Sequence, residues 1–287
     1  MFDRVLLPTD GSDAASSAVE YGGLLAATFG AAGIVVHVSE SERGDDRGAE
    51  VVRGGRQLVS QMGAVDHGDY RSGDPVRAIL ESATENGADA IVMGVHGHLD
   101  ETQAVTASRT RIDTETRATL GRVTQHVVRE APVPVLVVPP CHPKRQRVWG
   151  SRFVVATDGS IHARRTLDTT VELARLVDGD VHAVSVVDCG LLDGDEDVEV
   201  MWGPLYSNAH RIAADSRDVA TDGGIAAATT AVRIGSTHQE IRAYADECGA
   251  DCLALGVYGR SGPTSGFLGT VTERILRTAT RPVWTFR

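Results

Sequence analysis

Short, nearly continuous apolar runs alternate with segments of helical periodicity along the whole chain. Each half holds four such runs, at residues 5–7, 34–38, 91–93 and 135–138, then at 153–156, 181–187, 252–255 and 283–286. A weaker strand is expected just before Gly73 and just before Gly235. Runs without polar alternation are typical of strands buried on both faces, as in a parallel sheet between helices. The pattern predicts an α/β fold with a doubly wound parallel sheet in each half.

The two halves of the chain repeat one another. The segment DRVLLPTDGS at residues 3–12 returns as SRFVVATDGS at residues 151–160, an offset of 148 (151 − 3 = 148). The segment that begins at Gly73 returns from Gly235, and the offset there is 162 (235 − 73 = 162). We therefore expect two tandem domains, residues 1–140 and 151–287, joined by a proline-containing, basic linker at 141–150.

Composition and charge narrow the class of protein. The 287 residues are 42% hydrophobic and 23% charged, and the formal net charge is −11. Nucleic-acid binding needs a basic face, so we expect no nucleic-acid partner. No apolar run approaches the roughly 20 residues of a membrane span, and the start of the chain has no signal-peptide pattern. The four cysteines form no CxxC pair. These features predict a cytoplasmic protein without a membrane partner.

Three segments of the second half follow its predicted strands, and ligands bind beyond the carboxyl ends of strands in open α/β sheets. TDGS at 157–160 follows the first strand, and Asp188 follows the second. The glycine-rich segment GVYGRSGPTSGFLGT at 256–270 follows the fourth strand, and a helix is expected to begin at Thr270. Glycines let the main chain approach a polyanion closely, and a helix N-terminus favours negative charge. The sequence therefore predicts a phosphate-binding loop.

The spacing of this loop, Gly-x2-Gly-x9-Gly-Ser/Thr, resembles the ATP-binding signature of the universal stress protein family. TDGS after an apolar strand and the Pro-Val start of the last strand are similar too. The resemblance covers nearly the whole chain, twice. It implies Rossmann-like domains of the adenine nucleotide alpha hydrolase-like kind that bind ATP or a related adenine nucleotide, together with a divalent cation such as Mg²⁺.

The resemblance also implies roles by position. Asp158 would bond the ribose or the adenine, Val186 would contact the base, and the glycine loop would cradle ribose and phosphates. Arg260 would either reach the phosphates or point to solvent. From the residues alone, Asp10 and Asp158 could instead serve only to start a helix. The implied nucleotide-binding residues are Thr157, Asp158, Val186, Leu255, Gly256, Gly259, Arg260, Gly269, Thr270 and Val271.

The first half departs from this loop pattern. Between Gly97 and Gly121 stand 23 residues (121 − 97 − 1 = 23), and Arg122 follows instead of Ser or Thr. We therefore expect a degenerate, weak or empty site in the first half. Its candidate residues are Thr9, Asp10, Val38, Met93, Gly94, Gly97 and Gly121.

These features together predict a stress-response protein that binds an adenine nucleotide mainly in its second domain and acts through conformation or partner binding. No general base or positioned nucleophile is evident, so any ATP hydrolysis is expected to be slow and no catalytic residue is predicted. No HExxH or Cys/His spacing is present, so no protein metal site is expected. Two alternatives stay open, an interaction scaffold that binds no nucleotide and a slow ATPase.

The last strand of each half predicts how the domains associate. The strands expected at 133–138 and 282–286 are short and apolar, and each has a proline near its start, which an edge strand tolerates. An unpaired apolar edge invites aggregation, so we expect the two tethered domains to pair as a pseudo-dimer. Further association of whole chains into a homo-oligomer stays open, because the sequence does not indicate it either way. Expressed separately, residues 1–140 and 151–287 should therefore associate, as measured by their masses in solution; two soluble monomers would contradict the pairing.

Overall fold

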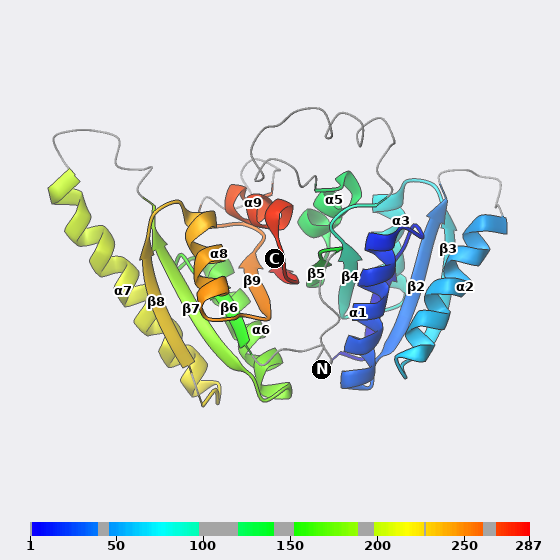
Figure 1. Ribbon diagram of the computed structural model, residues 1–287, viewed down its shortest axis with the longest axis horizontal. Coiled ribbons are helices and arrows are strands. Elements are labelled where there is room, and N and C mark those ends of the chain that lie inside the picture. The colour runs from blue at the N-terminus through cyan, green and yellow to red at the C-terminus, as the bar shows by residue number, and fades with distance from the viewer. Residues whose placement is uncertain are drawn as a thin grey trace. The chain divides into compact units, whose positions relative to one another are not determined.

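The computed structural model describes residues 2–39, 46–97, 120–140, 152–188, 198–226, 228–260 and 268–287. The chain divides into two compact units, whose main parts are residues 1–148 and 149–275. In each unit, helices lie on both faces of a parallel sheet (Figure 1). This arrangement confirms the predicted α/β fold with a doubly wound sheet in each half.

The first unit has the strand order β3-β2-β1-β4-β5, and all described neighbours in it are parallel. Helix α1 packs beside α2, and α3 packs beside α5. The elements are β1 (Arg4–Pro8), α1 (Asp13–Phe29), β2 (Ala32–Ser39), α2 (Asp46–Gln61), β3 (Val65–Ser72), α3 (Pro75–Glu85), β4 (Ala90–Gly94), α5 (Arg122–Glu130) and β5 (Val135–Val138).

The second unit repeats this topology with the strand order β8-β7-β6-β9-β10, again parallel. Helix α6 packs beside the long helix α7. The elements are β6 (Arg152–Ala156), α6 (Ile161–Leu176), β7 (Asp180–Val187), α7 (Val198–Asp222), β8 (Ala228–Ile234), α8 (Thr237–Glu247), β9 (Cys252–Gly256), α9 (Thr270–Thr278) and β10 (Val283–Phe286).

The eight apolar runs of the sequence all lie within strands, and the two weaker strands are β3 and β8. Strands β4 and β5 are buried at every position, as expected for a parallel sheet covered on both faces. The outer strands differ, because β3 is polar and exposes Val65 and Tyr70 while β8 exposes Ile234. This contrast explains why the sequence signal of these two strands is weak.

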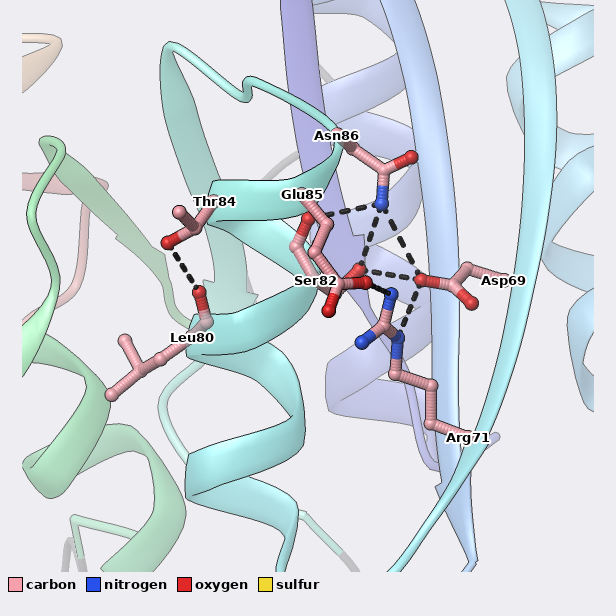
Figure 2. A network of polar contacts seen from close by, with 7 residues as sticks. All are labelled: Asp69, Arg71, Leu80, Ser82, Thr84, Glu85 and Asn86. Carbon is pink, nitrogen blue, oxygen red and sulfur yellow. Dashed lines mark hydrogen bonds and ion pairs between the residues drawn. The ribbon is translucent and has the colours of Figure 1, made fainter.

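A network of ion pairs and hydrogen bonds ties the outer strand β3 to helix α3 (Figure 2). Asp69 accepts hydrogen bonds from Arg71 Nε at 2.8 Å, Ser82 Oγ at 2.6 Å and Asn86 Nδ2 at 3.5 Å. Arg71 also pairs with Glu85 at 2.6 Å. One carboxylate therefore joins the strand to the end of the helix through two donors, Ser82 and Asn86, and also holds Arg71 of its own strand.

The second unit has an equivalent ion pair between β8 and α8, with the aromatic ring of Tyr244 next to its arginine. Arg233 pairs with Glu247, and its guanidinium lies 5.2 Å from the centre of the Tyr244 ring. The Tyr244 hydroxyl lies 2.9 Å from Nδ1 of His182. Burial raises the pKa of Tyr244, and burial followed by the charge of Arg152 lowers the pKa of His182. At neutral pH these directions favour a neutral hydroxyl–imidazole pair.

We predict that Asp69→Ala destabilises the first unit by about 1–3 kcal/mol, because three donors lose a charged acceptor. The measurement is chemical denaturation of the full chain followed by circular dichroism. Glu81→Ala is the matched control, because Glu81 pairs on the same helix with Arg77 in an exposed i,i+4 contact that should contribute little. Equal effects of the two variants would contradict a special role for the Asp69 network.

Candidate functional site

A cavity of about 880 Å³ opens at the carboxyl ends of β6, β7 and β9 in the second unit. All ten residues that the sequence indicated in this half lie in its lining. Two further groups of lining residues come from α7 and α8, and the sequence did not indicate them. They are Leu205, Asn208, Ala209 and Ile212 on α7, and Thr237 and Ile241 on α8.

The TDGS segment forms the turn between β6 and α6. Thr157 N–H donates to the Val184 carbonyl at 2.9 Å, which is the last described bond between β6 and β7. Gly159 has φ of 78°, a left-handed conformation that favours glycine. Ser160 is the N-cap, since its Oγ accepts from the N–H of Ala163 at 3.2 Å. The helix is therefore capped by the serine, and Asp158 stands two residues before it.

Asp158 holds two loops together instead of capping the helix. Its Oδ1 accepts the N–H of Ser160 at 2.9 Å, and its Oδ2 accepts the N–H of Arg260 at 3.0 Å. Arg260 returns the contact, because Nε and Nη2 donate to the Asp158 carbonyl oxygen at 2.9 and 2.5 Å. Arg260 was expected either to reach the phosphates or to point to solvent. The residue is exposed, but its guanidinium is bonded to the TDGS turn.

The three loop glycines are required by the packing of the loop itself. A Cβ atom at Gly256, Gly259 or Gly269 would lie 2.9, 3.1 or 3.0 Å from an oxygen atom of a neighbouring segment. The contact at Gly256 would force a shift, and those at Gly259 and Gly269 would require the neighbouring atoms to move by a few tenths of an ångström. The packing of the loop therefore favours glycine at all three positions.

Helix α9 begins at Thr270, as the sequence predicted, with its first turn in the lining of the cavity. Two bonds fix this start: Gly269 N–H donates to the Val257 carbonyl at 3.0 Å, and Thr272 Oγ1 donates to the Gly256 carbonyl at 2.7 Å. The first N–H groups of a helix have no acceptor within the helix. Thr270 and Val271 stand at that position beside the cavity, where the helix dipole favours an anion.

Val186, near the carboxyl end of β7, also lines this cavity, and the direction of its main-chain groups can be derived from the neighbouring bonds. Along a strand the N–H and C=O groups point alternately to either neighbouring strand. The Val184 carbonyl faces β6, where Thr157 donates to it, and the Val187 carbonyl faces β8, where it accepts from Gly235 at 3.0 Å. The N–H and C=O of Val186 therefore face the β6 side, beyond the end of β6 at Ala156. They present one donor and one acceptor side by side.

The described part of the first unit keeps the same loop bonds. Gly121 N–H donates to the Val95 carbonyl at 2.9 Å, and Thr124 Oγ1 donates to the Gly94 carbonyl at 2.9 Å. Within the described part of this unit, Thr9 and Asp10 line a separate hollow of about 520 Å³ beside α2. The other five candidates are not in the lining of that hollow; they are Val38, Met93, Gly94, Gly97 and Gly121. Most of the long segment between Gly97 and Gly121 lies outside the described residues.

A histidine occupies the strand end in the first unit where the second unit has a serine. His37 and Ser185 hold equivalent positions, 148 residues apart (185 − 37 = 148), in β2 and β7. The His37 Nδ1 lies 2.8 Å from the Thr9 carbonyl oxygen, and its ring lies 6.0 Å from that of Tyr70. Ser185, by contrast, lines the large cavity. The imidazole thus takes up space next to the TDGS turn of the first unit.

Among the described residues, no cluster of three or more His, Cys, Asp or Glu side chains could hold a metal ion. No helix in the same part of the chain is long and apolar enough to cross a membrane.

Comparisons with known proteins match the geometry of both units. The model described as "Universal stress protein family" matches residues 1–139 and 151–287. A universal stress protein of Methanocaldococcus jannaschii is 27% identical over 154 residues, which cover 48% of this chain and 82% of that protein. A solved universal stress protein from Archaeoglobus fulgidus has a TM-score of 0.70 and 22% identity, over 98% of this chain and 95% of that chain. A solved structure from Pseudomonas aeruginosa has a TM-score of 0.66 and 16% identity, over 99% and 92% of the two chains. Because the family model matches both halves, this chain belongs to the universal stress protein family, with two of its domains in tandem.

Proposed function

We propose that this protein is a stress-response adenine-nucleotide-binding protein whose nucleotide lies in the cavity of the second unit. One observation carries the proposal. A single cavity has an open strand edge at Val186 on one side and the start of helix α9 at Thr270 on another. Its volume of about 880 Å³ lies within the range of roughly 300–1,000 Å³ that is usual for ligand pockets.

The two sides of the cavity suit the two ends of a nucleotide. Adenine presents an acceptor, N1, beside a donor, the 6-amino group, and Val186 offers the complementary N–H and C=O. The phosphates carry negative charge, which the N–H groups of Thr270 and Val271 favour. The apolar side chains of Leu205, Ile212 and Ile241 line the same space and would cover the faces of the base.

The charges in the lining bear on the form of the nucleotide. Asp158, Asp188 and Glu273 line the cavity, and Arg260 is bound to the TDGS turn. Among the described lining residues, a bare triphosphate would meet these carboxylates, while the guanidinium of Arg260 is already bonded to the Asp158 carbonyl. We therefore propose that ATP binds with a divalent cation such as Mg²⁺, which would supply the missing positive charge.

We propose binding, with hydrolysis slow if it occurs. Both carboxylate oxygens of Asp158 accept main-chain N–H groups of the protein, so this carboxylate holds the two loops together and is not aimed at an attacking water. The nucleotide would therefore act through conformation or partner binding. One assay distinguishes this proposal from a scaffold that binds no nucleotide. Chromatography of small molecules released from the denatured purified protein should detect an adenine nucleotide if the protein is a binder and none if it is a scaffold.

The first prediction of this proposal concerns stoichiometry. Isothermal titration of the full chain with ATP, AMP and cAMP should give close to one nucleotide per chain for the ligand that binds. The panel includes cAMP because a universal stress protein has been solved in complex with cAMP. The proposed reason for a single site is that His37 stands beside the TDGS turn of the first unit and that the glycine spacing there departs from the family's signature. Two equal sites per chain would contradict the proposal for the first unit.

The second prediction concerns the glycine loop. Gly269→Val should abolish nucleotide binding, because its side chain would collide with the Val257 carbonyl and push the start of α9 away from the ligand. Thr270→Ala should weaken binding by about 0.5–1.5 kcal/mol if one neutral hydrogen bond is lost.

Gly121→Val is the matched control for the glycine loop. Gly121 makes the equivalent main-chain bond in the first unit, and a Cβ there is equally crowded, at 3.0 Å from His96 Cα. The control should retain binding at the second unit. Circular dichroism first establishes that each variant folds. A folded Gly269→Val variant with unchanged affinity would refute the proposed loop.

A further inference from the structure

We propose that Asp188 is a specificity-determining residue that selects adenine over 6-oxo purines by accepting a hydrogen bond from the adenine 6-amino group. Asp188 follows β7 directly and lines the large cavity of the second unit. Because it needs a bound purine, this inference rests on the proposed function. It goes further by naming the group of the base that the site recognises, which is the 6-amino group of adenine.

Asp188 is held in place by a residue of the neighbouring helix. Thr237, the first residue of α8, donates its hydroxyl to Asp188 Oδ2 at 2.7 Å, and both residues line the cavity. A carboxylate offers about four acceptor positions. The Thr237 bond uses one of these positions and orients the carboxylate in the lining of the cavity.

The direction of β7 places Asp188 next to the expected 6-substituent. The N–H and C=O of Val186 face the cavity, with the C=O nearer the carboxyl end of the strand. Asp188 is two residues farther along, just beyond the end of β7, and it lines the same cavity. A purine whose N1 accepts from Val186 N–H directs its 6-substituent toward the Val186 carbonyl and the carboxyl end of β7, which Asp188 follows.

The chemistry of the 6-position then decides which purine fits. An amino group has two protons, one for the Val186 carbonyl and one for the Asp188 carboxylate. In hypoxanthine and guanine a carbonyl oxygen stands at this position, and it would face two acceptors without a proton between them. Leaving buried polar groups mismatched in this way is costly, and sites built around such hydrogen bonds discriminate strongly.

The first unit has an acidic residue at the position of Asp188, which is Glu40 (188 − 148 = 40), but it has no threonine at the position of Thr237. Pro75 stands where the second unit has Thr237, 162 positions earlier (237 − 75 = 162), and proline has no hydroxyl to donate. The Asp188–Thr237 pair is therefore not needed to start α3 or to complete the sheet. It accompanies the large cavity.

The test compares ATP with ITP by isothermal titration of the full chain. We expect the unaltered protein to bind ATP more tightly than ITP. In Asp188→Asn the amide can donate to a 6-oxo group, so the ratio of the two dissociation constants should fall by roughly 10- to 100-fold, as expected for loss of a charged hydrogen bond. Thr237→Val should lower the same ratio less, because the carboxylate stays but loses its orienting partner.

Asp215→Asn is the matched control, since Asp215 lies on α7, is exposed, and pairs with Arg211 outside the cavity lining. This variant makes the same change of charge and should leave the ratio unaltered. An unchanged ratio in Asp188→Asn would overturn the inference. So would a loss of ATP affinity that disappears with 2′-deoxy-ATP, because Asp188 would then bind the ribose. If the unaltered protein binds neither nucleotide, the proposed function itself fails, which is a different result from binding without a role for Asp188.

Discussion

The cavity depends on one feature of the sheet, which is that β6 ends before β7. The bond from Thr157 N–H to the Val184 carbonyl is the last described one between the two strands, and β7 continues to Val187. Beyond that bond, the edge of β7 that faces β6 has no neighbouring strand in the described residues, while the other edge stays paired with β8. The same constraint exists in the first unit, where Thr9 N–H donates to the Val36 carbonyl at 2.9 Å. What differs between the units is the side chains that surround this open edge.

In the second unit Asp158 links the loops around the open edge. Its carboxylate accepts from the TDGS turn and from the segment after β9, and its carbonyl accepts from Arg260. A Cβ at Gly259 would lie 3.1 Å from the same carboxylate. The aspartate and the glycine therefore depend on each other. The geometry of the loop is set by hydrogen bonds within the protein, before any ligand contributes.

Much of this could be predicted from the sequence because it follows from local patterns. Apolar runs fixed the strands, and the spacing of glycines placed the loop and the start of α9. The α7 face could not be assigned, although Leu205, Asn208, Ala209 and Ile212 stand at helical spacing, because periodicity reveals a face but not what it covers. The orientation of Arg260 could not be predicted either. Its acceptor is the main-chain carbonyl of Asp158, and every residue type has such a carbonyl. Ser185 and His37 became informative only once the strand register showed that they are equivalent.

The repeat separates what the fold needs from what a ligand would need. The loop bonds of Gly121 and Thr124 in the first unit match those of Gly269 and Thr272 in the second. Retained glycines therefore indicate a retained fold, and they carry less information about binding than their resemblance to a signature suggests. Besides the spacing of the loop glycines, the units differ at the end of the second strand of each. A ring bonded to the TDGS turn stands there in one unit, and a serine followed by an oriented carboxylate stands there in the other. Because nothing in the shared fold requires these differences, they are where selection for a ligand would act.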